Sequence, residues 1–178
     1  YQALLAQTTG SANIAVGDRT LATVTTASGH TALGTQALRY NTTGNNNTAL
    51  GYLALNANTT GAQNCAIGSN SLDACTTGTL NTAVGHSSLS AMTIGNYNTA
   101  VGRLALAAIT TSEHNTAVGM NALASCQTND NTALGSEALS TTVNGTRNAA
   151  VGKHALSANT TGALNVAVGY ASLFAATT

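Results

Sequence analysis

A five-residue motif recurs ten times along this chain at a near-constant spacing. In its commonest form it reads Asn-Thr-Ala-Val-Gly, and its closing glycines are Gly17, Gly34, Gly51, Gly68, Gly85, Gly102, Gly119, Gly135, Gly152 and Gly169. Successive glycines are 17 residues apart, except that 16 residues separate Gly119 from Gly135. Self-similarity at a short fixed period is typical of repeat architectures, in which each unit packs on its neighbours. We therefore expect a single repeat domain over residues 1–178.

Aligned on the motif glycine, the repeats separate into columns of uniform chemistry. The residue two before the glycine is always Ala, and the residue one before it is Val, Leu or Ile. The residue four after the glycine is always Leu. Asn stands four residues before the glycine in nine of the ten repeats, and His30 takes that position in the other. In most repeats a second glycine follows the leucine by six residues, often after a pair of threonines.

The period predicts an all-β parallel solenoid of about ten 17-residue coils. Helical hairpin repeats need about 33 residues and leucine-rich repeats at least about 20. The 18 glycines, with many Thr, Asn and Ser, also disfavour helix. We expect two short strands per coil, one in the Asn-Thr-Ala-Val part of the motif and one around the Ala-Leu pair. The residue missing from the 16-residue repeat falls in the turn at 128–130, where a solenoid tolerates a deletion.

Side-chain alternation places the two apolar columns of the motif on opposite faces of the strand. We expect the Val/Leu/Ile column to fill a thin interior together with the leucine column. These interior leucines are Leu21, Leu38, Leu55, Leu72, Leu89, Leu106, Leu123, Leu139, Leu156 and Leu173. The alanines would then face outward, and positions that accept only a methyl group indicate close approach of another layer.

On this interpretation the alanine column is the contact surface of a homo-oligomer. The predicted interface residues are Ala15, Ala32, Ala49, Ala66, Ala83, Ala100, Ala117, Ala133, Ala150 and Ala167. The alternative turns the alanines into a very narrow interior and leaves the aliphatic column as an exposed stripe. Only 6% of the residues are charged and the net charge is 0, whereas about a quarter of an isolated soluble domain is charged. This composition also favours an assembled fibre.

The motif, followed by Ala or Ser and then Leu, resembles the head repeats of YadA-like trimeric autotransporter adhesins and related repeats of phage and large-virus fibres. The match extends over all ten repeats, although the period here is longer than the usual family repeat. The resemblance implies a left-handed β-roll, three rolls side by side in a homotrimer, and a role in surface attachment. It also implies an extracellular location, on a cell or virion surface.

The polar columns contain residues that we expect to hold successive coils together and residues that are candidate glycosylation sites. We expect the Asn column to bond the backbone of the next coil at its turn; examples are Asn47, Asn64, Asn81, Asn98 and Asn115. Five asparagines begin Asn-x-Thr sequons at predicted turns, and they are candidate glycan acceptors in a host with a secretory or viral glycosylation route. They are Asn41, Asn46, Asn58, Asn144 and Asn159.

Residues for catalysis or metal binding are sparse. The four histidines occupy four different columns, so we expect no metal or cofactor. Cys75 and Cys126 share a column three coils apart, roughly 14 Å, which is beyond disulfide reach. We interpret the thiols as small buried or half-buried side chains, with a bond between subunits as the alternative. The threonine pairs are adjacent rather than alternate, which disfavours an ice-binding face.

Function is therefore expected to lie in the rod itself. Zero net charge and 3% aromatic residues argue against nucleic-acid binding. The sequence contains no run of 18 apolar residues of the kind that inserts into a membrane, so we expect no membrane insertion. Neither end carries a capping repeat, so we expect a longer parent protein or end-to-end stacking into a filament. We predict a structural fibre and not an enzyme; the alternative is an adhesin head that binds a cell-surface or glycan receptor. The column after the motif glycine is the predicted partner-contacting face: Tyr52, Arg103, Met120, Lys153 and Tyr170.

Overall fold

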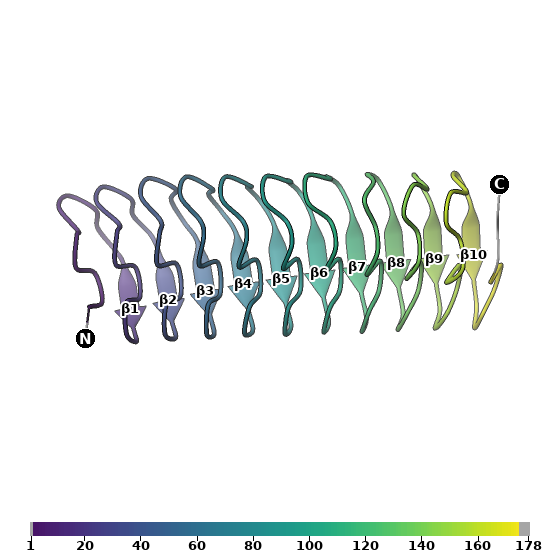
Figure 1. The fold of residues 1–178 in the computed structure, drawn as a ribbon, viewed down its shortest axis with the longest axis horizontal. Coiled ribbons are helices and arrows are strands. Elements are labelled where there is room, and N and C mark those ends of the chain that lie inside the picture. Colours follow the sequence, from purple (N-terminus) through teal and green to yellow (C-terminus); the bar gives the residue numbers. More distant parts are fainter. Residues whose placement is uncertain (1, 175–178) are drawn as a thin grey trace.

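The computed structural model describes residues 2–174, which form a parallel β-solenoid of about nine turns with about 17 residues per turn. Each motif contributes one three-residue strand. The strands are β1 Ile14–Val16, β2 Thr31–Leu33, β3 Thr48–Leu50, β4 Cys65–Ile67, β5 Thr82–Val84, β6 Thr99–Val101, β7 Thr116–Val118, β8 Thr132–Leu134, β9 Ala149–Val151 and β10 Val166–Val168. They lie side by side in chain order along a rod (Figure 1). The prediction of an all-β solenoid is confirmed, and residues 2–174 contain no helix.

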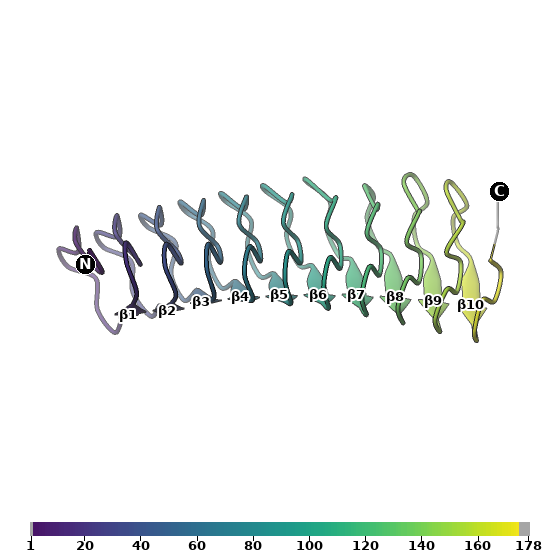
Figure 2. The ribbon, with the colours of Figure 1, turned by 60° about the horizontal axis from the view of Figure 1, so that its bottom comes forward.

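The strands pair in parallel, and equivalent repeat positions stand directly opposite one another. Ala83 pairs with Ala100, and Thr82 pairs with Thr99. The register is kept across the short repeat, where Thr116 pairs with Thr132. Figure 2 shows the strands gathered along one side of the rod and the irregular parts of each coil along the other. Every sequence column is therefore a straight row of side chains along the rod.

The motif glycines are required both by their backbone conformation and by close packing between coils. Their φ angles lie between +120° and +139°, a region that other residues rarely adopt. A Cβ atom added to Gly85 would lie 2.6 Å from the carbonyl oxygen of Gly102 in the next coil. The glycine column thus allows successive coils to approach at the bend that ends each strand.

The predicted second strand around the Ala-Leu pair is wrong, because this segment is a turn. Each leucine of the column has a φ angle between +45° and +53°, in the left-handed region. This conformation costs about 1–2 kcal/mol for a residue with a Cβ, whereas burial of a leucine side chain contributes about 1.5–3 kcal/mol. The Leu55 N–H also donates to the Ser71 carbonyl oxygen at 2.9 Å. Burial and hydrogen bonding to the next coil therefore offset the local strain.

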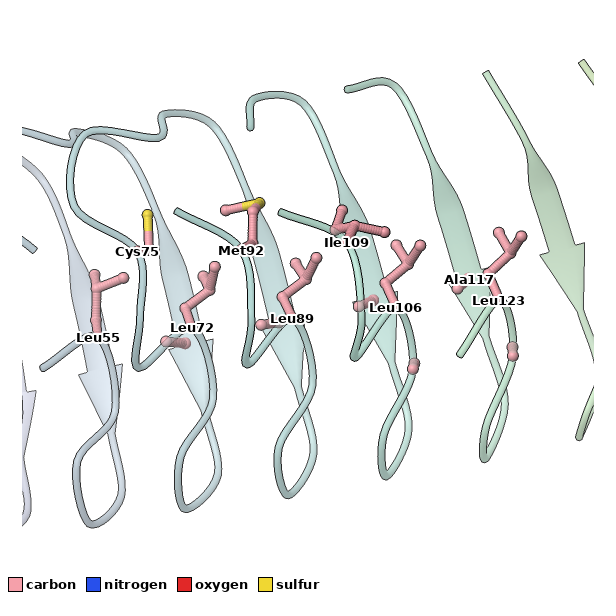
Figure 3. Packing of buried hydrophobic residues seen from close by; sticks show 14 of the residues in the cluster. Leu55, Leu72, Cys75, Leu89, Met92, Leu106, Ile109, Ala117 and Leu123 are labelled. Carbon is pink, nitrogen blue, oxygen red and sulfur yellow. The ribbon is translucent and has the colours of Figure 1, made fainter. Parts of the chain in front are cut away.

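The interior is built around the leucine column, as predicted. Leu21, Leu38, Leu55, Leu72, Leu89, Leu106, Leu123, Leu139 and Leu156 are fully buried. Leu173, in the last described turn, is 53% exposed. A second buried column lies three residues after each leucine and includes Cys75, Met92 and Ile109 (Figure 3). The same column holds the buried polar residues Asn41, Asn58, Thr142 and Asn159.

The prediction that the strand alanines face a neighbouring subunit is wrong, because they point into the interior of their own chain. Each of these alanines is at most 1% exposed: Ala32, Ala49, Ala66, Ala83, Ala100, Ala117, Ala133, Ala150 and Ala167; Ala15 is partly buried. They belong to the same core cluster as the leucines. The leucine side chains and the buried column three residues after them already fill most of the width of the coil. Only a methyl group therefore fits on the strand that faces them. The aliphatic column, predicted to be interior, lies on the outer face.

Candidate functional site

The outer face of the sheet carries a continuous row of aliphatic side chains, which we call the aliphatic ladder. It consists of Val16, Leu33, Leu50, Ile67, Val84, Val101, Val118, Leu134, Val151 and Val168. Leu33 is 44% exposed, Leu134 48% and Val151 38%. The ladder residues of β4 to β7 are half-buried between their neighbours. Contiguous exposed apolar rows of this kind are common at contact surfaces of proteins.

A second row on the same face runs beside the aliphatic ladder. It comprises the first residue of each strand, which is Thr in six strands and Ile, Cys, Ala or Val in the others. Neither row contains a charged residue. The outer face of the sheet is thus uncharged from β1 to β10, and a close contact there would bury no unpaired charge.

The asparagine column forms a buried hydrogen-bonded row, as predicted. In its regular pattern, the Oδ1 atom of one asparagine accepts the backbone N–H of the asparagine in the next coil. Examples are Asn81 Oδ1 with the Asn98 N–H at 2.9 Å and Asn47 Oδ1 with the Asn64 N–H at 2.9 Å. The side-chain amide donates to the next coil as well, as from Asn81 Nδ2 to the Gly95 carbonyl oxygen at 2.9 Å. These side chains hold coil to coil rather than form a binding row.

His30 replaces asparagine in this row and makes an equivalent bond. Its Nδ1 atom accepts the Asn47 N–H at 3.2 Å, and its own N–H donates to Asn13 Oδ1 at 3.0 Å. The side chain is 1% exposed, and this burial lowers the pKa of His30 below its ordinary value. Because Nδ1 accepts a hydrogen bond, the row requires the neutral imidazole.

The glycosylation prediction is wrong for three of the five sequons. Asn41, Asn58 and Asn159 are fully buried in the interior column that follows the leucines. Asn58 Nδ2, for example, donates to the Gly61 carbonyl oxygen at 2.9 Å. A glycan cannot be accommodated in that space. Asn46 and Asn144 are exposed, and for these two residues glycosylation stays a prediction.

The burial of the cysteines fits their interpretation as small buried or half-buried side chains. All three are free thiols; Cys75 and Cys126 are buried, and Cys65 is half-buried on the outer sheet face. Burial raises the pKa of the Cys75 thiol to about 11 and raises the pKa values of Cys65 and Cys126 above the ordinary value. Within residues 2–174 no group of three or more His, Cys, Asp or Glu side chains could hold a metal ion.

The column after the motif glycine points outward, as predicted. Tyr52 is 53% exposed, Met120 44% and Tyr170 74%, and Arg103 and Lys153 are also exposed. Arg103 and Met120 lie on successive coils, as do Lys153 and Tyr170, but Tyr52 stands three coils before Arg103 and the coil of Ser136 separates the two pairs, so the five residues do not form one compact site. Figure 1 shows how far apart coils such as those before β4 and after β10 stand along the rod.

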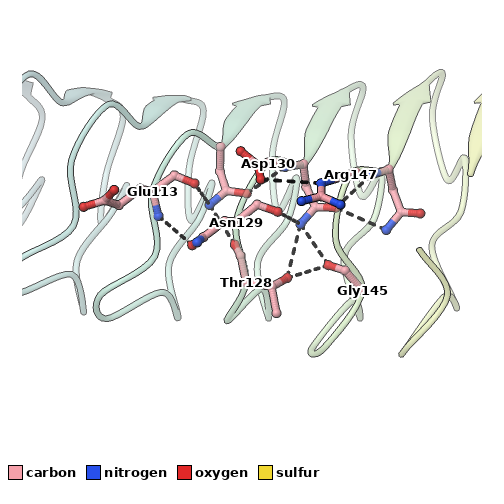
Figure 4. Close-up of polar contacts among 9 residues, drawn as sticks. Glu113, Thr128, Asn129, Asp130, Gly145 and Arg147 are labelled. Carbon is pink, nitrogen blue, oxygen red and sulfur yellow. Dashed lines mark hydrogen bonds and ion pairs between the residues drawn. The ribbon is translucent and has the colours of Figure 1, made fainter. Parts of the chain in front are cut away.

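The 16-residue repeat creates a polar notch in the side of the rod, and sequence reasoning missed it. In this coil the Thr128 carbonyl oxygen accepts Asn115 Nδ2 at 2.8 Å, the bond that the second glycine makes in most regular coils. Thr128 thus takes the glycine's place, and one threonine position is absent. The resulting open notch has a volume of about 440 Å³ and is lined by Thr111, Ser112, Gln127, Thr128, Asn129, Asp130, Thr146 and Arg147. Figure 4 shows the polar contacts of Thr128, Asn129, Asp130 and Arg147. The 16-residue spacing identified the irregular coil in the sequence, but it did not predict a cavity there.

Comparisons with known proteins provide no assignment. No protein-family model matches the chain, and neither a curated protein nor a solved structure does. Across residues 2–174, there is no helix with the length and apolar character needed to span a membrane.

Proposed function

We propose that this chain is a segment of a structural fibre, a homotrimeric rod exposed on the surface of a cell or virion. The observation that carries the proposal is the aliphatic ladder, which leaves an uncharged apolar face uncovered from β1 to β10. Contact between copies of the chain would remove this face from water. The proposal replaces the alanine column with the aliphatic ladder as the subunit interface.

A second copy of the chain is the partner that fits this face. The ladder repeats once per coil, at roughly 4.8 Å, along ten strands. A partner with a different surface period would lose register with it after a few coils. Another copy has the same period, the same uncharged face and the same length, so its aliphatic side chains can interdigitate with this ladder throughout.

The number of subunits and the hand of the coil come from the resemblance to YadA-like head repeats. In this proposal three left-handed rolls turn their sheet faces toward a common axis. The interior columns and the asparagine row already tie each coil to the next within one chain. Lateral contact between three such rods would make the assembly stiffer, which suits a fibre that must extend away from a surface.

The oligomeric state tests the proposal directly. The wild-type chain, measured by native mass spectrometry and analytical ultracentrifugation, should have three times the mass of one chain. Val151→Lys places a charge on the aliphatic ladder and should yield single chains. Leu80→Lys makes a similar change on a side chain that is 42% exposed but lies in a turn, so this control should remain trimeric.

A monomeric wild-type chain would overturn the proposal. Equal assembly of Val151→Lys and Leu80→Lys would move the interface away from the sheet face. Circular dichroism of both variants is needed in parallel, because it shows whether each chain has kept its β-solenoid.

A further inference from the structure

We propose that the polar notch at the short coil binds an uncharged oligosaccharide, with the neighbouring Tyr97–His114 ring pair as an apolar platform. This inference goes beyond the fibre proposal and does not depend on it. The notch lies in turns that precede the strands, whereas the aliphatic ladder lies on the sheet face. A rod assembled through its sheet faces would therefore leave the notch open.

The notch exists because one coil is shorter than its neighbours. The coils on either side keep their full turns, so residues 111–112 on one side and 146–147 on the other form its walls. The floor comes from the short turn at 127–130. Three successive coils thus contribute, and the backbone of each is fixed by inter-coil bonds such as Asp130 N–H to the Glu113 carbonyl oxygen at 3.3 Å. The site is preformed by the architecture of the rod.

The chemistry of the lining favours a neutral ligand rich in hydroxyl groups. The side chains are hydroxyls, amides and a single carboxylate–guanidinium pair, Asp130 with Arg147, at 3.9 Å. They offer donors and acceptors close together and sum to zero charge, so neither an anion nor a cation is favoured. No aliphatic or aromatic side chain lines the notch, which excludes an apolar ligand. Sugar hydroxyls both donate and accept, and so they match this mixture.

The fold holds the polar groups of the notch in place but leaves hydrogen-bond donors of Asn129 and Arg147 available to a ligand. Asn129 is held because its Oδ1 atom accepts the Glu113 N–H at 2.9 Å (Figure 4). Within residues 2–174 the Asn129 NH2 group has no hydrogen-bond partner. The Arg147 side chain is 68% exposed, and its guanidinium contacts Asp130 only at the outer limit of an ion pair. Both groups can donate to a ligand without breaking the structure.

The aromatic platform lies next to the notch in the same column of the repeat. Tyr97, His114, Asp130 and Arg147 occupy equivalent positions in four successive coils, with φ angles of 57° to 63°. The Tyr97 and His114 rings stack at 5.0 Å with an interplanar angle of 10°, and Tyr97 is 53% exposed. An exposed ring fixed by stacking can pack against the C–H face of a sugar while its polar edge stays in water. The four side chains span roughly 14 Å, enough for a short oligosaccharide.

A glycan array probed with the complete chain is the first test. We expect binding to uncharged oligosaccharides, and the oligosaccharide with the highest signal then serves as titrant in isothermal calorimetry. Arg147→Gln and Tyr97→Ser should each weaken its binding at least about tenfold. Gln63→Ser alters the same exposed column three coils before the notch and should leave affinity unchanged.

A one-residue insertion provides the sharpest variant. A threonine inserted between Gln127 and Thr128 restores the 17-residue spacing, which should fill the notch and abolish binding while the solenoid is kept. Recognition limited to acidic glycans, no recognition of any glycan, or full affinity in the insertion variant would each overturn the proposal. The oligomeric mass is measured for every variant, so a failed sugar test leaves the fibre proposal to be judged separately.

Discussion

The Nδ1 atom of His30 accepts the backbone N–H of Asn47 at 3.2 Å, a bond that an asparagine Oδ1 accepts in the regular coils. A single titratable group therefore stands in an otherwise uncharged, buried row. Protonation of the ring would place a proton on the accepting atom and a charge in the interior. This relationship makes the stability of the rod sensitive to mild acid.

We predict that the wild-type chain loses stability between pH 7.5 and pH 5, and that His30→Asn removes much of this loss. Burial lowers the pKa of His30 in the folded chain, whereas the unfolded side chain titrates near its ordinary value of about 6.5. Below that value the unfolded chain binds more protons, so acid favours unfolding. Thermal melts of both chains at several pH values check this. Parallel curves for the two chains would contradict the assigned role of His30.

Ala100→Leu should destabilise the single chain rather than only its assembly. Ala100 is fully buried opposite the leucine column, so three added carbons overpack the interior by about 1–3 kcal/mol. Val101→Leu, on the outer face one residue later, is the matched control and should cost less. Urea denaturation compares the two variants. An Ala100→Leu chain with wild-type stability would show that the interior is wider than described.

Gly85→Ala should destabilise the rod more than Gly169→Ala does. Both glycines have strongly positive φ angles, so backbone strain is common to the two variants. A Cβ at residue 85 would meet the Gly102 carbonyl oxygen at 2.6 Å, whereas a Cβ at residue 169 meets nothing within 4 Å. The difference between their unfolding midpoints measures the close approach of successive coils. Equal midpoints would show that the conformation alone requires glycine.

The thiols should differ in their reaction with iodoacetamide at pH 8. The raised pKa of Cys75, about 11, leaves roughly one thiolate in a thousand at this pH, and the side chain is buried. Cys65 is half-buried on the outer sheet face and should be modified first. If sheet faces meet in the assembled fibre, Cys65 should react more slowly in the wild type than in Val151→Lys. Mass spectrometry of digested peptides gives the rates, and faster labelling of Cys75 than of Cys65 would contradict the described burial.

Much of the fold could be predicted from the period and the columns. The leucine interior and the asparagine row follow because a residue type repeated every coil must occupy one environment, and both were confirmed. Alternation also shows that Ala100 and Val101 point in opposite directions. It does not show which of the two points inward, because that depends on the width of the coil. The width is set by turns such as the one at Leu106, which has a φ angle of 50°. A leucine in the sequence does not indicate this left-handed conformation.

The notch was beyond sequence reasoning for a related reason. The 16-residue interval identified a deletion at 128–130, but which position was lost depends on the hydrogen bond that Thr128 takes over from a glycine. Asp130 and Arg147 occupy the same position of two successive repeats, and they become neighbours because the coils stack in register. The sequence columns predict the environment of residues that recur in every coil. They do not predict a site that forms where one repeat is shorter than the others.

The asparagine row also bears on how a molecule of this kind changes length over evolutionary time. Every coil with an asparagine in this row offers the next coil the same acceptor and the same donor, as Asn81 offers them to Asn98 and Gly95. A gene segment encoding one coil can therefore be duplicated or lost while every newly adjoining pair of coils finds its complementary groups in place. Recombination between repeats would alter reach in steps of a single coil, without the need for a new interior to be invented.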